Sequence, residues 1–332
     1  MPQFHSSNPL VTDIDPAILG AQRGANKQFA QMPHPDVRTP KGLEMLRTLT
    51  ANNDTGTVLA PVDRAISIAT GSTRLRTFVP EGPLRGVMLR IHGGGWAAGT
   101  PEDDDTLNDQ VARGCGIAVV SPDYRLTPDV TIADQIDECV AVAEWLDANA
   151  AAEFGSETLL LGGISAGAHL AAATLLRLRD SSSRTFRKVV GVVLDSGPYD
   201  LGGIGSAYLA DEDTLILPRT WVAAFAEIGL PGYSTEARRV GALSPMLNDL
   251  SGLPPALFTA GILDPMRDDS ILMAQRWQLA GSSADLDVWP DAPHTFTNMS
   301  TPLGDLGLER MTTWITSVLD QVEAEAGALA VT

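Results

Sequence analysis

The order of apolar and polar positions along the chain predicts an alternation of strands and helices from about residue 72 onwards. Short apolar runs are separated by longer segments in which apolar residues recur at helical spacing. The predicted strands are Ser72–Val79, Val87–Ile91, Ile117–Val120, Thr158–Leu161, Val189–Leu194, Ala256–Ala260 and Leu286–Trp289. The predicted helices are Gly42–Thr50, Ile132–Leu146, Ala166–Leu178, Ser270–Leu279 and Leu308–Val322. This alternation is typical of βαβ units, so we expect an α/β fold with a mostly parallel central sheet flanked by helices.

Two segments depart from this alternation, and we expect them to form a helical cap. Residues 1–55 have mixed polarity and several X-Pro steps, and residues 200–245 hold aromatic residues among glycines and prolines. We therefore divide the chain into an N-terminal cap segment, residues 1–55, and a catalytic domain, residues 56–332. The cap insertion of the catalytic domain is expected at about 200–245.

Charge and hydropathy exclude several classes of partner. The chain has 332 residues and a formal net charge of -18, which repels nucleic acid phosphates and anionic lipid headgroups. No uninterrupted apolar stretch approaches the roughly 18 residues of a transmembrane helix. The N-terminus lacks a basic start followed by an apolar run, so we expect no secretory signal and a cytoplasmic location.

The sequence offers no pattern of metal ligands. Its five histidines are scattered, and the two cysteines, Cys115 and Cys139, lie in apolar surroundings that favour free buried thiols over a disulfide or a metal site. The acidic run Asp103–Asp105 is interpreted as a solvated loop or a helix start. We therefore expect no metal site.

The strongest chemical signal is the sequence GISAG at residues 163–167. It follows an apolar strand and precedes a helix rich in alanine and leucine, as a nucleophile elbow requires. The sharp turn holds the serine backbone under strain, so small residues must flank it. Because the turn lifts the hydroxyl above the sheet at a helix N-terminus, Ser165 is the candidate nucleophile.

A second signal is the sequence HGGGW at residues 92–96, directly after the predicted strand Val87–Ile91. A run of glycines lets backbone N–H groups point into a cavity without obstruction from side chains. Such a loop can bind the oxyanion of an acyl-transfer reaction. His92 is expected to hold the shape of this loop.

The third signal is a candidate acid and base for Ser165. Asp264 follows the predicted strand Ala256–Ala260, and His294 follows the predicted strand Leu286–Trp289. Both therefore lie at the carboxyl ends of strands, on the rim that carries the chemistry of a parallel sheet. His294 would take the serine proton, and Asp264 would orient the imidazole and stabilise its charged form.

Three other residues compete for these roles. His169 lies four residues after Ser165, but there it would lie down the helix, so we interpret it as a core or supporting histidine. Asp268 and Asp269 compete with Asp264, but they fall one turn further on, at a predicted helix start where acidic residues suit the helix dipole.

Taken together, these motifs resemble the bacterial hormone-sensitive-lipase-like esterases of the α/β-hydrolase fold. The likeness covers roughly Val87 to Phe296 and the closing helix. It rests on HGGGW at 92–96, DYRLTP at 123–128, GISAG at 163–167, DPMRDD at 264–269, and His294 followed two residues later by Phe296.

The resemblance implies an N-terminal cap and an oxyanion hole. The oxyanion donors would be the backbone N–H groups of Gly93, Gly94 and Ala166. It also implies a carboxylesterase that hydrolyses short- to medium-chain acyl esters without a cofactor, through a Ser-His-Asp triad and an acyl-enzyme intermediate.

Aromatic residues near the expected site are candidates for substrate binding. Trp96 stands beside the oxyanion glycines, and Trp221 and Phe225 lie in the expected cap insertion. Bulky rings there would narrow an acyl channel. The alternative is that these rings only pack the cap.

A ligand-binding module of the same fold is the alternative from another functional class. Such a module would lack the catalytic base, whereas His294 and its acid are present here. An amidase or a lactonase would use the same triad, and the motifs do not separate them from an esterase. The expected partner is a small-molecule ester, and a homodimer is left open.

Overall fold

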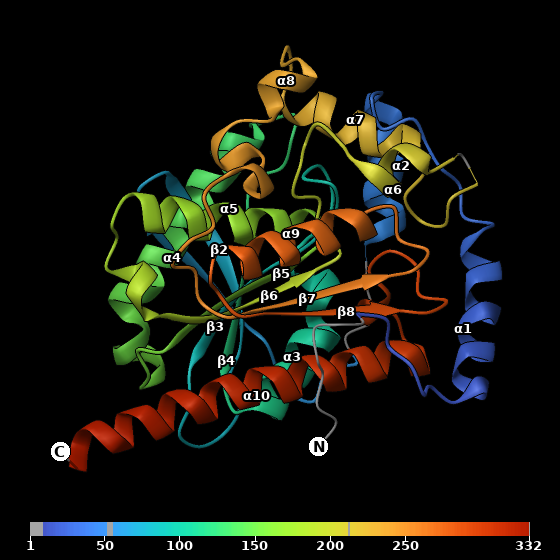
Figure 1. Ribbon diagram of the computed structural model, residues 1–332. Helices are drawn as coiled ribbons and strands as arrows, with labels where there is room; N and C mark the ends of the chain where they lie inside the picture. The colour runs from blue at the N-terminus through green and yellow to red at the C-terminus, as the bar shows by residue number, and fades with distance from the viewer. Residues whose placement is uncertain (1–8, 52–55, 212, 332) are drawn as a thin grey trace.

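The computed structural model describes residues 9–51, 56–211 and 213–331, arranged around one eight-stranded sheet (Figure 1). The segment examined for a secretory signal lies largely in residues 1–8, outside the described residues. The strands are β1 Val62–Ile68, β2 Gly71–Phe78, β3 Val87–Ile91, β4 Ala118–Pro122, β5 Leu159–Ile164, β6 Val189–Asp195, β7 Ala256–Gly261 and β8 Ala284–Trp289. Their order is β1-β2-β4-β3-β5-β6-β7-β8, antiparallel from β1 to β4 through β2 and parallel from β4 to β8. The predicted α/β fold with a mostly parallel sheet is confirmed.

Helices cover both faces of this sheet. The α-helices are α1 Pro16–Phe29, α2 Pro40–Thr50, α3 Asp105–Cys115, α4 Ile132–Phe154, α5 Ala166–Asp180, α6 Gly205–Leu209, α7 Arg219–Gly229, α8 Thr235–Arg238, α9 Arg267–Leu279 and α10 Pro302–Val331. Short 3-10 helices are η1 Pro101–Asp104, η2 Thr185–Lys188, η3 Gly241–Leu243, η4 Pro245–Leu247 and η5 Phe296–Asn298. Helices α4, α5 and α9 lie on one face, and α3 and α10 lie on the other (Figure 1). None of the helices in the described ranges is both long and apolar enough to span a bilayer.

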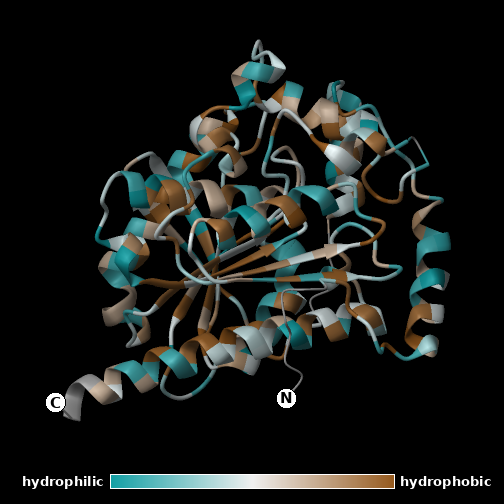
Figure 2. Ribbon diagram, viewed as in Figure 1, coloured by the Kyte–Doolittle hydropathy of each residue, from teal (hydrophilic) through white to brown (hydrophobic). Residues whose placement is uncertain are grey.

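Burial of apolar side chains holds these layers together. The strands at the centre of the molecule are largely apolar, whereas teal, hydrophilic positions are common on the surrounding helices (Figure 2). All five residues of β3 and all six residues of β5 are buried, as expected for strands covered on both faces.

The two cysteines are buried and free, as the sequence predicted. Burial raises the pKa of the Cys115 thiol to about 11.

The cap is assembled from two separate parts of the chain. Trp221 of α7 donates its indole N–H to the carbonyl of Pro35, and Arg38 forms an ion pair of 2.7 Å with Glu227. Residues 34–50 therefore join the segment around 200–245 above the sheet (Figure 1).

Earlier residues of the N-terminal segment pack elsewhere. The backbone of Val288 in β8 donates to the carbonyl of Pro9 and accepts from the N–H of Val11. Helix α1 then packs beside α10, and Ile18 contacts the apolar cluster around Trp289. The predicted cap segment, residues 1–55, is thus divided: its first helix belongs to the body of the molecule.

The acidic run Asp103–Asp105 differs from the expectation of a solvated segment. It does start a helix, but the side chains of Asp104 and Asp105 are buried. Asp104 forms an ion pair of 2.5 Å with Arg90 of β3, and Asp105 forms one of 2.6 Å with Arg76 of β2. These carboxylates can be buried because arginines of β2 and β3, the strands on either side of β4, neutralise their charges.

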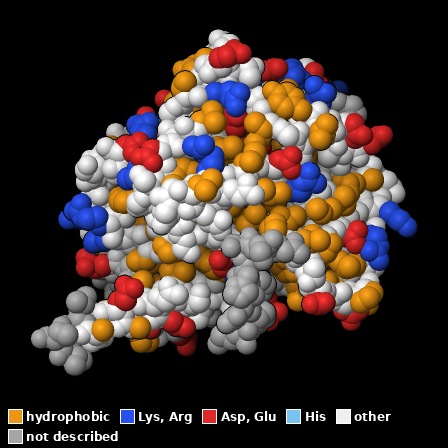
Figure 3. All heavy atoms as spheres, in the orientation of Figure 1, with side chains coloured by type: hydrophobic (Ala, Val, Ile, Leu, Met, Phe, Trp, Pro, Cys, Tyr) orange, Lys and Arg blue, Asp and Glu red, His pale blue; other side chains and the backbone are white. Residues whose placement is uncertain are grey.

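Charged side chains are interspersed on the face shown in Figure 3, where acidic and basic groups alternate with apolar ones. The excess of acidic residues therefore does not gather into one patch on this face. Among the described residues, no group of three or more His, Cys, Asp or Glu side chains is arranged to hold a metal ion.

Replacement of Asp104 by alanine should destabilise the fold strongly. Arg90 is 1% exposed, so loss of its carboxylate partner would leave a buried charge uncompensated. We expect Asp104→Ala to lower the free energy of unfolding by about 3–5 kcal/mol, measured by urea denaturation. The matched control is Asp137→Ala, which breaks an exposed pair with Arg177 and should cost about 1 kcal/mol or less. Equal losses in the two variants would contradict this account.

Candidate active site

Ser165 occupies a sharp turn between β5 and α5. Its backbone φ is 56°, in the left-handed region that residues with a Cβ rarely adopt. A methyl group added at Gly163 would overlap the backbone of Gly167, and one added at Gly167 would overlap the carbonyl of Ile91. Both glycines are therefore required by close backbone packing, and the turn raises the serine hydroxyl above the carboxyl end of β5.

Three predicted side chains are joined by hydrogen bonds at this point. Ser165 Oγ lies 2.8 Å from His294 Nε2, and His294 Nδ1 lies 2.8 Å from Asp264 Oδ1. The same carboxylate oxygen accepts from the backbone N–H of Met266 at 2.7 Å. Because a carboxylate faces Nδ1, that nitrogen carries the proton, and Nε2 is left to accept the proton of the serine hydroxyl.

The loop that carries His294 is fastened to neighbouring strands by polar side chains. The hydroxyl of Thr297 donates to Asp195 at the end of β6, and the backbone N–H of Thr295 donates to the hydroxyl of Ser196. Asn298 donates to Asp104 at 2.9 Å. Burial raises the pKa of Asp195 to about 6. No motif in the sequence marks these supporting residues; the one signal is that Asp195 and Ser196 directly follow the predicted strand Val189–Leu194.

The glycine loop lies against the nucleophile. A Cβ at Gly93 would stand 3.4 Å from the Cβ of Ser165, and Gly94 has a φ of 111° that suits glycine. None of the hydrogen bonds found within the described ranges uses the backbone N–H of Gly93, Gly94 or Ala166. Ala166 begins α5, so its N–H belongs to the unpaired first turn of a helix. These three N–H groups thus lack a hydrogen-bond partner within the described residues.

His92 stabilises the shape of this loop. Its ring stacks on Tyr124 with centroids 4.2 Å apart, and its Nδ1 donates to the carbonyl of Gly93 at 2.9 Å. The hydroxyl of Tyr124 donates to the carbonyl of His92. Burial lowers the pKa of His92, which keeps the ring neutral in this supporting position.

His169, the rival base, is occupied elsewhere. Its Nδ1 accepts the indole N–H of Trp96 at 3.2 Å, and its Nε2 donates to the carbonyl of Leu243 at 3.0 Å. Burial lowers the pKa of His169 to about 4. Both ring nitrogens are thus engaged with groups other than the serine, in agreement with a supporting role.

The rival carboxylates also have other partners. Asp268 accepts from the backbone N–H of Ser206 at 2.8 Å. Asp269 accepts from the backbone N–H groups of Tyr199 and Asp200. Neither of them is hydrogen bonded to His294, whose Nδ1 faces Asp264.

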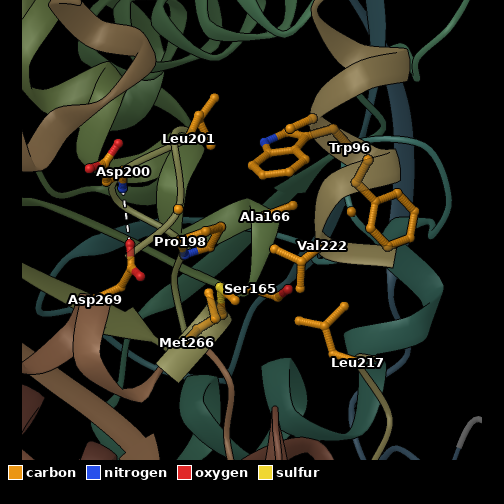
Figure 4. Close-up of a pocket in the computed structure, with 15 residues that line it drawn as sticks. Trp96, Ser165, Ala166, Pro198, Asp200, Leu201, Leu217, Val222, Met266 and Asp269 are labelled. Carbon is orange, nitrogen blue, oxygen red and sulfur yellow. Dashed lines mark hydrogen bonds between the residues drawn. The ribbon is translucent and has the colours of Figure 1, made fainter. Parts of the chain in front are cut away.

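A pocket opens beside Ser165 beneath the cap (Figure 4). Its lining residues are Gly95, Trp96, Ser165, Ala166, Pro198, Asp200, Leu201, Gly203, Ala207, Leu217, Val222, Phe225, Ala226, Met266 and Asp269. The cavity volume is about 60 Å³, far below the roughly 300–1,000 Å³ of sites that enclose drug-sized ligands. Its geometry therefore suits a small group.

The three predicted substrate-binding residues differ in their placement. Trp96 and Phe225 line the pocket, whereas Trp221 is not among the lining residues. The indole of Trp221 packs edge-on against His34 and Phe225 and is held by a hydrogen bond to Pro35. Trp221 thus packs the two parts of the cap together, as in the alternative stated for these rings.

Comparisons with known proteins agree with this geometry. A family model described as alpha/beta hydrolase fold matches residues 88–298. Carboxylesterase NlhH of Mycobacterium tuberculosis is 31% identical over 219 residues, which cover 64% of this chain and 67% of that protein. An acetyl esterase of Salmonella typhi is 28% identical over 246 residues, covering 71% of this chain and 73% of that protein.

A solved structure extends the likeness to nearly the whole chain. An esterase from the bacterial hormone-sensitive lipase family superposes with a TM-score of 0.75 at 24% sequence identity, covering 92% of this chain and 100% of that one. The chain therefore belongs to the alpha/beta hydrolase fold family, in which it is a serine ester hydrolase similar to the bacterial hormone-sensitive-lipase esterases.

Proposed function

We propose that the chain is a carboxylesterase that cleaves short- to medium-chain acyl esters of small molecules through Ser165, His294 and Asp264. The observation that carries this proposal is the continuous hydrogen-bonded chain from Asp264 through His294 to Ser165, which ends at a small pocket. A ligand-binding module would not need a base within hydrogen-bonding distance of the serine.

The first half of the reaction forms an acyl-enzyme. Ser165 Oγ attacks the ester carbonyl while His294 Nε2 takes the hydroxyl proton, and the carboxylate of Asp264 stabilises the resulting imidazolium. The negative charge that develops on the carbonyl oxygen is stabilised by the backbone N–H groups of Gly93, Gly94 and Ala166. His294 then gives its proton to the leaving alcohol.

In the second half, water replaces the alcohol. His294 Nε2 accepts a proton from the water as it attacks the acyl carbonyl, and the same three N–H groups bind the oxyanion again. Collapse of this intermediate releases the carboxylic acid, and the proton returns from His294 to Ser165 Oγ. Each proton and charge in this sequence is handled by groups of the chain itself.

Replacement of the nucleophile should abolish turnover without unfolding the protein. Ser165→Ala removes the hydroxyl, and because the triad acts as a unit we expect kcat for a short aryl ester to fall by roughly 10⁴-fold or more. Circular dichroism should match the wild type. A folded variant with wild-type turnover would exclude Ser165 as the nucleophile.

The two histidines near the serine should respond differently to substitution. His294→Ala removes the only group hydrogen bonded to Ser165 Oγ in the described structure, so hydrolysis of the same ester should be lost. His169→Asn should retain turnover, with lower thermal stability because His169 is fully buried. The opposite pattern, an inactive His169 variant beside an active His294 variant, would reverse the assignment of the base.

Acyl chain length should be limited by the pocket. Each buried methylene contributes roughly 0.8 kcal/mol, but only while the pocket has room for it. The cavity is small, and bulky residues such as Trp96 and Phe225 line it. We therefore expect kcat/KM for aryl esters to peak between about two and eight acyl carbons, with no activation by emulsified substrate. A maximum at long chains, or a jump in rate above substrate solubility, would contradict this.

A further inference from the structure

The pocket beside Ser165 combines an apolar lining with two buried carboxylates. Asp200 and Asp269 line it together with apolar residues from the cap and from the ends of the strands. They are 3% and 1% exposed, respectively. Figure 4 shows both on the same side of the pocket, across from Trp96. Carboxyl groups in such a place need a partner, because burial penalises a charge that is not compensated.

Asp200 has a partner of opposite charge. Its Oδ2 lies 2.8 Å from the guanidinium of Arg239, and its Oδ1 accepts from the backbone N–H of Gly202. The charge of this carboxylate is therefore balanced from outside the pocket, since Arg239 is partly exposed.

Asp269 differs from Asp200 in this respect. Two backbone N–H groups, those of Tyr199 and Asp200, donate to its Oδ1 at 2.7 and 3.0 Å. Within the described part of the chain, no Lys or Arg forms an ion pair with it. Burial raises the pKa of Asp269 to about 8, and the nearby carboxylates of Asp200 and Asp264 act in the same direction. A cation placed in the pocket would reverse that effect.

The remaining lining suits a cation attached to a hydrocarbon chain. Aliphatic side chains such as Leu217 and Val222 offer contacts to methylene groups, and the rings of Trp96 and Phe225 line the same cavity. Aromatic rings attract cations through their negative faces, and this attraction grows where water is excluded. A neutral hydroxyl could bond to Asp269 but, unlike a cation, would not stabilise the negatively charged form of its carboxyl group.

We propose that this pocket is a subsite for an alkylammonium group carried by the ester substrate, and that Asp269 recognises the positive charge. The inference rests on the proposed esterase function, because it names the class of ester that the same site prefers. The net charge of -18 also favours the approach of cationic over anionic substrates.

Two pairs of nearly isosteric esters test this preference, since an ammonium group replaces a terminal methyl in each. The acyl pair is 4-nitrophenyl 6-aminohexanoate and 4-nitrophenyl heptanoate, and the alcohol pair is 4-aminobutyl acetate and pentyl acetate. The measurement is the ratio of kcat/KM, cationic over neutral, at about pH 8, where a primary amine remains charged. In a purely apolar pocket the neutral member would be preferred. We expect a ratio above one in at least one pair for the wild type.

Substitution of the carboxylate should remove that preference. Asp269→Asn keeps an oxygen to accept the two backbone N–H groups but carries no charge. We expect it to lower the cationic-to-neutral ratio by about tenfold or more, the usual value of a hydrogen bond to a charged group. The matched control is Asp268→Asn, which changes the neighbouring carboxylate of the same helix, outside the pocket lining, and should leave the ratio within about twofold of the wild type.

A binding measurement separates this inference from the catalytic proposal and also serves if Asp269→Asn does not fold. Calorimetry with Ser165→Ala should show that 4-aminobutan-1-ol or 6-aminohexanoamide binds more tightly than pentan-1-ol or heptanamide. Two results would overturn the ammonium subsite and leave the esterase proposal intact. One is hydrolysis of the neutral esters by the wild type with a cationic-to-neutral ratio of kcat/KM at or below one in both pairs. The other is equal binding of the charged and neutral compounds. Failure to hydrolyse any of the four esters would instead overturn the esterase proposal, and the subsite with it.

Discussion

The positive φ of Ser165 is the constraint on which the rest of the site depends. The turn brings the backbone of Gly163 against that of Gly167, and Gly167 against the carbonyl of Ile91, so steric packing requires glycine at both positions. Once the serine is raised, Ser165 and Ala166 both line the pocket beneath the cap. The loop at residues 92–96 after β3 and the loop with His294 after β8 then both approach Ser165.

Much of this arrangement could be predicted from the sequence because its causes are local. A glycine on each side of a serine, after an apolar strand and before a helix, leaves few backbone solutions, and parallel strands bring their carboxyl ends to one rim. Asp264 and His294 are expected on the same rim because each follows directly from the end of its strand. In the structure His294 Nδ1 lies 2.8 Å from Asp264 Oδ1.

Features that depend on partners distant in the sequence could not be predicted. Only Ile66 is fully buried in β1, so this edge strand lacks the alternation that identifies a strand. The sequence predicts a solvated loop or a helix start for the acidic run at 103–105, and a helix does start there. The burial of Asp104 and Asp105 could not be predicted, because it depends on Arg90 and Arg76 of two strands earlier in the chain. Likewise, the orientation of Trp221 depends on Pro35, which lies 186 residues earlier in the chain.

The pairing of residues 9–11 with β8 has a consequence for how the molecule meets its own copies. An unprotected strand at the rim of a sheet offers its backbone to any other strand, which invites fibre-like association. Here the N–H and C=O of Val288 are already bonded within the chain, so a second molecule can continue the sheet at this point only after the N-terminal segment is released. Removal of the residues before residue 12 would thus expose the backbone N–H and C=O of Val288 to pairing with a strand of another molecule.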